Sequence, residues 1–330
     1  MDKIKVAFIY KPSNIFMTGK HFDNVYYNFF IKALPRNKSI DITYFPEEEK
    51  FDISKLKNKF DIILLWQNNE FGTPDLIGIR DSNIPVITRC ADPRETKITK
   101  EYHKKWKIDY YFHFWPEPFF HSILPKNYKY KSIIYGLETS LYKNVKPFDE
   151  RIKNKILNSG AIGNPKPLSK IINDIRNPKW NAYRVYHLRT IVNDLPYVDY
   201  FPTLQNKFVG DKFPLLLEKY QASIAACTIT TVAKMWEIPA AGCMTFLEVN
   251  EKNNADSFGF KDQENAVFIN EQNYKEKFTE YLESVEDSKW KRIAEKGRKF
   301  VMENLNNDKA VEALVELMES AIKEKDDESK

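Results

Sequence analysis

Glu237 is an acid surrounded by apolar residues, and a carboxylate in such surroundings needs a partner. Its neighbours Met235, Trp236 and Ile238 belong to a segment, residues 230–242, that the sequence pattern predicts to be helical. Two turns into this helix, a carboxylate would lie beside the ribose of a nucleotide and could accept hydrogen bonds from both ribose hydroxyls. The alternative is a surface Glu or a structural ion pair, which the apolar neighbours disfavour. We therefore interpret Glu237 as a nucleotide-binding acid.

Two threonines, Thr230 and Thr231, stand where this helix is expected to begin. Backbone N–H groups at a helix start lack intrahelical partners, and together with the positive end of the helix dipole they form a site for a diphosphate. The alternative is ordinary capping of the helix by these residue types. Lys234, one turn further on, is interpreted either as a phosphate partner or as an exposed helix residue.

A loop at residues 159–164 supplies further candidates for binding phosphate. Its Gly160 and Gly163 allow the backbone to approach a ligand, although a plain turn would also favour glycine. A departing diphosphate needs positive charge nearby. The basic candidates are Lys166, Lys170, Arg189 and Lys234. The sequence contains no D-x-D pattern, so we expect no metal ion at this site.

The amino-terminal half offers two candidates for catalysis, Asp92 and His113. Asp92 follows a predicted strand directly, where it could act as a general base or contact an acceptor, and the alternative is a turn built by Asp–Pro. His113 lies at the end of the next predicted strand among aromatic residues. It is either a core residue or a group that contacts a sugar.

The elements that must position these residues alternate between strands and helices. Residues 4–10, IKVAFIY, are apolar apart from Lys5, as is typical of buried parallel strands. Further strands are predicted at 41–45, 61–66, 85–90 and 108–114, and helices at 24–34, 52–60, 74–82 and 97–106. This order predicts a parallel sheet with helices on both faces, the Rossmann-like arrangement.

The alternation resumes after a polar, turn-rich segment at 132–155, which we interpret as a linker. Strands are predicted at 155–163, 222–228, 243–249 and 266–269, helices at 168–175, 213–220 and 230–242, and helix throughout the remainder from 273. We expect an α/β protein with two Rossmann-like domains that face a cleft, and with carboxyl-terminal helices that pack back across the domains. The predicted boundaries are 1–145, 146–305 and 306–330.

Composition narrows the class of partner. The chain has 330 residues, 42% hydrophobic and 29% charged, which is typical of a folded globular protein. A net charge of +5 with dispersed basic residues permits an anionic ligand or a peripheral contact with an acidic membrane, and does not favour nucleic acid. Three widely spaced cysteines predict free thiols, and no signal peptide or membrane-spanning run is recognised, so we expect a cytoplasmic protein.

The segment VAKMWEIPAAGCMTFLE resembles the nucleotide-sugar-binding segment of GT-B fold glycosyltransferases, in the broad family 4 and spore-maturation-like group. The segments FGFKDQENAVFI and WKRIAEKGRKFVMENLNNDKAVEALVELM resemble the strand and closing helices that follow in these enzymes. ILNSGAIGNPKPLSKIIND resembles the first strand, glycine loop and helix of their donor domain. The resemblance covers most of residues 131–320.

The resemblance implies that Glu237 binds ribose, that Thr230 and Thr231 contact the diphosphate through their backbone, and that the loop with Gly19 faces the acceptor. Many family 4 enzymes carry a second Glu eight residues before the first, where this chain has Ile229. The implied function is a glycosyltransferase of hexosyltransferase type, retaining and independent of metal, with inversion by Asp92 left open. Its donor would be a nucleoside-diphosphate sugar, with no other cofactor.

Two other functions fit parts of the same pattern. A GT-B-fold sugar-nucleotide epimerase would share the donor domain, and a non-catalytic nucleotide- or sugar-binding protein would share the two-domain arrangement. A nicotinamide oxidoreductase is disfavoured because no G-x-G-x-x-G follows the first strand of either half. The acceptor is left open among a glycan, a lipid-linked intermediate, a protein and a metabolite.

Overall fold

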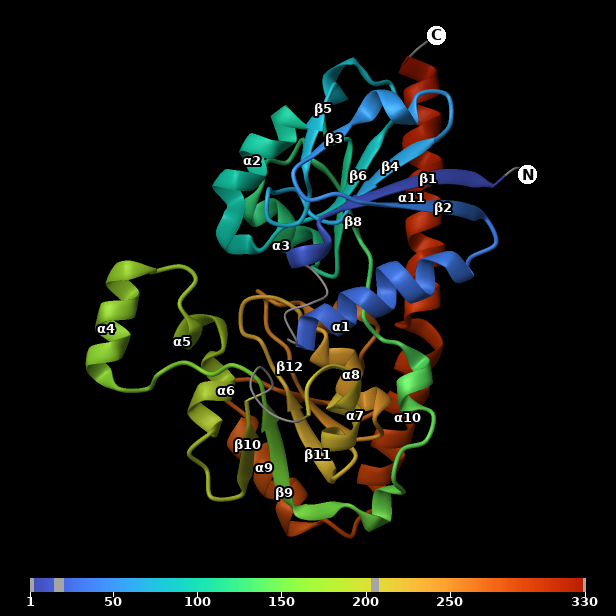
Figure 1. Ribbon diagram of the computed structural model, residues 1–330. Coiled ribbons are helices and arrows are strands. Elements are labelled where there is room, and N and C mark those ends of the chain that lie inside the picture. The colour runs from blue at the N-terminus through green and yellow to red at the C-terminus, as the bar shows by residue number, and fades with distance from the viewer. Residues whose placement is uncertain (1–2, 15–20, 203–207, 329–330) are drawn as a thin grey trace. The chain divides into compact units, whose positions relative to one another are not determined.

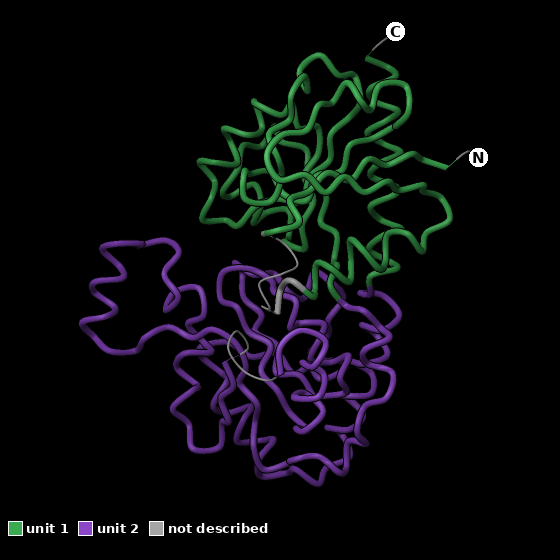
Figure 2. Tube along the Cα trace, viewed as in Figure 1, with its two compact units in different colours: residues 1–19, 23–136, 307–330 green, residues 20–22, 137–306 purple. Residues whose placement is uncertain are grey.

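The computed structural model describes residues 3–14, 21–202 and 208–328 of the chain. Two compact units, each with its own parallel sheet, make up the protein (Figure 2). Unit 1 comprises residues 1–19, 23–136 and 307–330, and unit 2 comprises residues 20–22 and 137–306. The predicted α/β class with two Rossmann-like sheets is thereby confirmed.

The sheet of unit 1 has six parallel strands in the order β2-β1-β4-β6-β7-β8. The strands are β1 (Ile4–Tyr10), β2 (Ile40–Pro46), β4 (Ile62–Leu65), β6 (Val86–Arg89), β7 (Tyr110–His113) and β8 (Lys129–Ser132). β4 and β6 are buried along their whole length, because helices cover both faces of a parallel sheet and leave no side for polar residues.

The helices of unit 1 come from its amino-terminal part and from the carboxyl-terminal end of the chain. They are α1 (His21–Tyr27), with a π-helical continuation η2 (Asn28–Ala33) and a 3-10 turn η3 (Leu34–Arg36), then α2 (Thr96–Lys105), α3 (Glu117–Ile123) and α11 (Asn307–Glu328). α11 contacts η2 and η3. Ion pairs between Arg36 and Asp308 at 2.7 Å and between Lys325 and Asp109 at 3.0 Å join it to the rest of the unit.

Two predicted helices of unit 1 are wrong. Residues 52–60 and 74–82 instead contribute β3 (Lys50–Asp52) and β5 (Asp75–Ile77), which pair as a separate two-stranded parallel sheet. Only short 3-10 turns, η4 (Ile53–Leu56) and η5 (Ile79–Asp81), follow them. Gly78 at φ +78° interrupts any helix in the second segment, because this left-handed conformation does not occur within a right-handed helix.

The sheet of unit 2 has five parallel strands in the order β10-β9-β11-β12-β13. They are β9 (Ile152–Ser159), β10 (Val198–Phe201), β11 (Tyr220–Ala225), β12 (Met244–Glu248) and β13 (Val267–Ile269). β11 and β12 are fully buried. Ile156, Ile224 and Phe246 from three neighbouring strands belong to one hydrophobic core with Phe278 and Trp290 from the helices.

The helices of unit 2 differ in how closely they pack. They are α4 (Pro167–Arg176), α5 (Ala182–Val185), α6 (His187–Val192), α7 (Phe213–Leu217), α8 (Lys234–Ala240), α9 (Tyr274–Glu283) and α10 (Ser288–Asn304). α8 and α10 contact β12 and each other. In Figure 1, α4 and α5 lie to one side of this unit, away from the strands.

The described residues also show the state of the cysteines and whether metal-binding clusters or membrane-spanning helices occur among them. Cys90, Cys227 and Cys243 are buried free thiols, as predicted. Within these residues, no three His, Cys, Asp or Glu side chains are grouped so that they could hold a metal ion. No helix in the described part of the chain has both the length and the apolar composition to cross a membrane.

Candidate functional site

Several buried charged residues of unit 2 lie on the segments at the carboxyl edge of its sheet. Because its strands are parallel, their carboxyl ends share one edge, and the segments that follow them lie close together there. Open α/β sheets bind their ligands at this edge. The edge includes Ser159 at the end of β9 and Glu248 at the end of β12, both buried.

Gly160 makes the turn that follows β9. Its φ is +110°, which side chains rarely permit, and its N–H donates to the Phe201 carbonyl at 2.9 Å. A Cβ atom at this position would overlap Nζ of Lys234 and Nη1 of Arg189. The backbone conformation therefore favours glycine here, and the ends of two cationic side chains approach this glycine closely.

These two residues, which we call the basic pair, share one acceptor. Nη1 of Arg189 donates to the Ser159 carbonyl at 3.0 Å, and Nζ of Lys234 donates to the same oxygen at 2.5 Å. Arg189 is 3% exposed and Lys234 is 7% exposed. The guanidinium stacks on the Tyr186 ring at 4.2 Å, and its buried Nε has no hydrogen-bond partner among residues 3–14, 21–202 and 208–328.

Burial and mutual repulsion both affect the charges of the basic pair. Burial, and then the neighbouring Arg189 guanidinium, lower the pKa of Lys234 well below its usual value, while the Glu237 carboxylate works in the opposite direction. Two adjacent buried cations repel each other and have lost hydration, so an anion that contacted both would relieve both costs.

Glu237 follows Lys234 by three residues on α8 and is close enough to raise the pKa of that lysine. It is 3% exposed and is the fourth residue of α8, so the predicted burial of this acid is confirmed. Burial and then the Glu237 carboxylate, through charge and a hydrogen bond, raise the pKa of the Tyr142 hydroxyl. Tyr142 was not a predicted site residue, because it lies in the segment interpreted as a linker.

The start of α8 differs from the prediction. The helix begins at Lys234, and its N-cap is Ala233, without a side-chain cap, so Thr230 and Thr231 do not cap it. The preceding residues form a bend, which puts Glu237 in the first turn of a short helix and not two turns into a long one. Both threonines are nevertheless buried, and the Thr230 hydroxyl has no hydrogen-bond partner.

The end of α8 is fixed by three residues. Pro239 cannot donate a backbone hydrogen bond, and Gly242 at φ +75° turns the chain toward β12. The buried Arg151, just before β9, donates from Nη1 to the Ala241 carbonyl at 2.9 Å. A cation at a helix carboxyl terminus satisfies a free carbonyl and complements the dipole.

Glu248 is a candidate that the sequence reasoning missed. It is 1% exposed, and its Oε1 accepts from Nδ2 of Asn250 at 3.3 Å. Its buried Oε2 has no hydrogen-bond partner within the described part of the chain. Burial raises its pKa from 4.5 to about 7, against opposing effects of Thr228 and Arg189. With Thr228, Asn250 and Glu271 it lines a cavity of about 480 Å³. Its position as the last residue of a parallel strand could have identified it.

Two predicted phosphate-binding residues lie apart from the basic pair. A Cβ at Gly163 would overlap the backbone of Tyr183, so this glycine permits close packing of two chain segments. Lys170 lies on α4, where its Nζ is 4.1 Å from the centre of the Tyr183 ring. Of the predicted basic candidates, the structure brings together Arg189 and Lys234.

In unit 1, Asp92 lies on the segment after β6. Its side chain is 41% exposed and caps η6 (Pro93–Glu95) by accepting from the backbone N–H of Arg94 at 2.9 Å. It also accepts from Nε and Nη2 of Arg94 at 2.8 and 2.9 Å. Burial by itself would raise the pKa of Asp92, but the hydrogen bonds from Arg94 outweigh it and hold this pKa below its usual value. A carboxylate held in this way is a weak base at neutral pH.

His113 ends β7 and is buried among aromatic rings. It stacks on Trp115 with ring centres 3.9 Å apart. Burial, and then Arg89, lower the pKa of His113 well below its usual value, so the ring is neutral. Its buried Nδ1 has no hydrogen-bond partner. The last candidate of this half, Gly19, lies outside the described residues.

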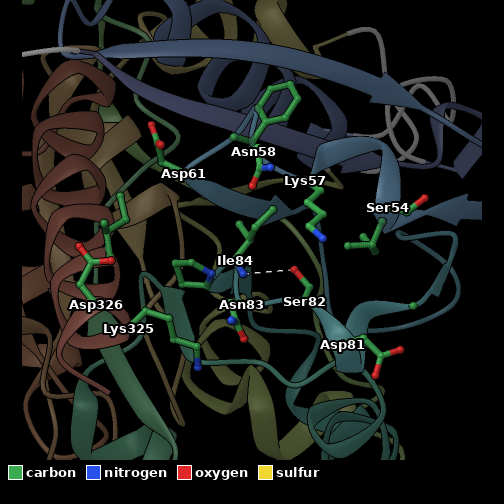
Figure 3. A pocket seen from close by; sticks show the side chains of 15 residues that line it. Ser54, Lys57, Asn58, Asp61, Asp81, Ser82, Asn83, Ile84, Lys325 and Asp326 are labelled. Atoms are coloured by element: carbon green, nitrogen blue, oxygen red, sulfur yellow. Dashed lines mark hydrogen bonds between the residues drawn. The ribbon is translucent and has the colours of Figure 1, made fainter. Parts of the chain in front are cut away.

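A larger cavity in unit 1, of about 730 Å³, lies at the opposite edge of its sheet (Figure 3). Asp61 and Pro85, which precede β4 and β6, place it at the amino ends of these strands, with Lys325 of α11 on another side. Ligands of open parallel sheets bind beyond the carboxyl ends. We therefore exclude this cavity as the candidate site in spite of its size.

Solved structures share this arrangement of two sheets. Anabaena HepE, in complex with UDP and glucose, is 12% identical, with a TM-score of 0.57 over 96% of this chain and 100% of that chain. Sucrose-phosphate synthase from Thermosynechococcus elongatus is 10% identical, with a TM-score of 0.59 over 96% and 99%. The chain has the GT-B fold. A glycosyltransferase from Rickettsia africae has the same likeness, at 12% identity, a TM-score of 0.56, and 98% and 100% coverage.

Comparisons by sequence add nothing to this result. No known family model matches the chain, and no curated protein matches it significantly. At these low identities, the likeness of the structures establishes the GT-B fold. Function must therefore be inferred from the residues at the carboxyl edge of the sheet in unit 2.

Proposed function

We propose that the protein is a glycosyltransferase that binds the diphosphate of a nucleotide-sugar donor at the basic pair. The observation that carries this proposal is the convergence of Arg189 and Lys234 on Gly160, at the end of β9, with an unpartnered buried Nε on Arg189. The solved structures of GT-B fold include HepE with UDP-glucose, which supports a donor of this class.

The basic pair has a defined task in such a reaction. The bond between the anomeric carbon and the diphosphate oxygen breaks, and the diphosphate leaves with the electron pair. Arg189 and Lys234 stabilise the negative charge that develops on it, and because they are buried their effect is stronger than in water. The acceptor oxygen bonds to the anomeric carbon, and its proton passes to the departing diphosphate. This course retains configuration and needs neither metal nor enzymic nucleophile.

The other candidates have proposed roles within their own units. Glu237 accepts hydrogen bonds from the two ribose hydroxyls, and the segment with Thr230 and Thr231 contacts the diphosphate through its backbone. In unit 1, the neutral His113 ring, with its unpartnered Nδ1, is suited to a hydrogen bond with a sugar hydroxyl. The weak basicity of Asp92 favours contact with the acceptor over deprotonation of it, and so supports retention.

Calorimetric titration with UDP, GDP, ADP and TDP tests the donor site. We expect one of them to bind, and the variants Arg189→Met and Lys234→Met to weaken binding by roughly 10- to 150-fold each, since each removes a charge-assisted hydrogen bond. The matched control is Lys170→Met, a lysine of the same domain that lies on α4 and should leave the affinity unchanged. Failure of all four nucleotides to bind, or an equal loss in Lys170→Met, would contradict the proposal.

Product analysis separates transfer from the two alternatives. Incubation with the sugar derivative of the nucleotide that binds should release nucleoside diphosphate, slowly to water and faster when an acceptor is present. An epimerase would return an isomeric nucleotide sugar, and a binding protein would return the donor unchanged.

A further inference from the structure

We propose that α4 binds the surface of an anionic phospholipid bilayer. Leu168, Ile171, Ile172 and Ile175 on this helix are 75%, 57%, 48% and 77% exposed. They are four of the nine large hydrophobic side chains that are exposed in the described part of the chain. Their spacing of three, one and three residues aligns them on one face of the helix.

The orientation of α4 is the reverse of that of an ordinary surface helix, and polar contacts hold it. Asp174 accepts from Nε of Arg184 at 2.8 Å and from Nδ2 of Asn181 at 2.9 Å, both in the segment of α5. Lys170 lies over the Tyr183 ring in the same segment. The polar side of α4 is thus directed to its own unit, and no residue of the helix is buried.

Electrostatic charge identifies the occupant of this face. Residues 166–184 contain five basic residues and one acid, a net charge of +4, while the whole chain has +5. The short segment that carries the exposed aliphatic face therefore has most of the net positive charge of the chain. An aliphatic face flanked by lysine and arginine is the arrangement by which helices lie in the interface of acidic membranes.

The same charge argues against a second copy of the chain as the occupant. A symmetric contact through α4 would oppose two surfaces that each carry +4, and like charges in an interface disfavour association. The helix lies to one side of its unit (Figure 1), and its four aliphatic side chains are exposed. A bilayer accepts such an exposed aliphatic face by insertion between headgroups.

Co-sedimentation with vesicles tests this proposal independently of the proposed function. Vesicles of equal parts phosphatidylcholine and phosphatidylglycerol should bind the protein at least tenfold more strongly than phosphatidylcholine alone, and salt should weaken the binding. The triple variant Leu168→Ser, Ile171→Ser, Ile175→Ser should lose binding at least tenfold. Lys166→Gln and Lys179→Gln should each reduce binding to the acidic vesicles about fivefold.

The matched control is Leu215→Ser, which changes an exposed leucine of α7 that is 49% exposed. It should bind vesicles as the unchanged protein does, and circular dichroism and nucleotide affinity should be the same for all variants. The proposal is wrong if the triple variant binds acidic vesicles normally. It is also wrong if the unchanged protein ignores these vesicles, or if ultracentrifugation shows a dimer that the triple variant abolishes.

Discussion

Each unit buries an arginine at the carboxyl edge of its sheet, and the two guanidinium groups differ in how many of their N–H donors are hydrogen-bonded. Arg89, at the end of β6 in unit 1, donates to the Trp66 and Cys90 carbonyls, at 3.2 Å each, and to the Gln67 side chain. Its guanidinium also lies over the Tyr26 ring at 4.5 Å. Arg189 in unit 2 has one donated hydrogen bond, to Ser159, and an unpartnered Nε.

Under the proposed function, this difference separates a cation that stabilises the fold from one that is available to a ligand. A buried donor without a partner costs free energy, and proteins rarely leave one in this state without reason. The environment of Arg89 is complete, so removal of this residue would leave carbonyls without donors. That of Arg189 is incomplete in the described structure and stands beside a second cation, Lys234.

The largest expected effect separates the two arginines by stability. Arg89→Met should lower the free energy of unfolding by about 3–5 kcal/mol, because it leaves the Trp66 and Cys90 carbonyls buried without donors. Arg189→Met should cost less than about 1 kcal/mol, since Lys234 still donates to Ser159. Urea denaturation of both variants measures this. Equal losses would remove the distinction between the two sites.

Glu248 sharpens the comparison through pH. Its raised pKa means that between pH 4.5 and about 7 the folded state binds more protons than the unfolded state, so its contribution to stability falls as pH rises through this range. Glu248→Gln should abolish the effect. The variant should be more stable than the unchanged protein by up to about 3 kcal/mol at pH 8 and equal to it near pH 4.5.

Asp92 in unit 1 supplies the control for this measurement. Its pKa is lowered, so it stabilises the folded state at neutral pH and loses this effect as pH falls. Asp92→Asn should therefore change stability in the opposite direction. If both variants shift in the same direction in urea denaturation at pH 8, the carboxylates of the two edges do not differ as described.

Lys234 should make nucleotide binding depend on pH. Its pKa is lowered in the free protein, and a bound diphosphate would raise it, so binding above the free pKa requires uptake of a proton. Affinity should fall by up to tenfold for each pH unit in that range. Calorimetry in two buffers of different ionisation enthalpy detects the proton, and Lys234→Met should remove the dependence. A protein that binds nucleotide without proton uptake at any pH would contradict this.

The smallest expected effect concerns Glu237. Glu237→Gln keeps one oxygen acceptor and should weaken nucleotide affinity about fivefold, the size of one ordinary hydrogen bond. Glu237→Ala should weaken it further while the protein remains folded. If the Ala variant unfolds and the Gln variant binds nucleotide normally, Glu237 has a structural role through its hydrogen bond with Tyr142 and does not bind nucleotide.

The sequence predicted those features of the fold that depend on apolar pattern. The mainly apolar segments of β1 and β4 identify buried parallel strands, because such strands are covered on both faces. The burial of Glu237 followed in the same way from its neighbours. Residues 52–60 and 74–82 were mistaken for helices. Such short segments carry too few apolar positions to distinguish the period of a helix from that of a strand.

Other parts of the site depend on contacts between distant segments. Arg189 was one of several basic candidates, and only the packing of α6 against the end of β9 distinguishes it from the exposed Lys166. Tyr142 reaches Glu237 across a sequence separation that no local pattern reveals. The sequence predicted a helix at 168–175 but not the exposure of its apolar face, because the period alone does not say which face is covered.

Both ends of α8 are attached to a single strand, and this has a consequence for dynamics. Lys234 at its start is bonded to Ser159, the last residue of β9, and the Ala241 carbonyl after its end is bonded to Arg151, which precedes β9. The helix that carries Lys234 and Glu237 is thus clamped to the strand. In hydrogen exchange, the amides of α8 should open together with those of β9, and more slowly than those of α4.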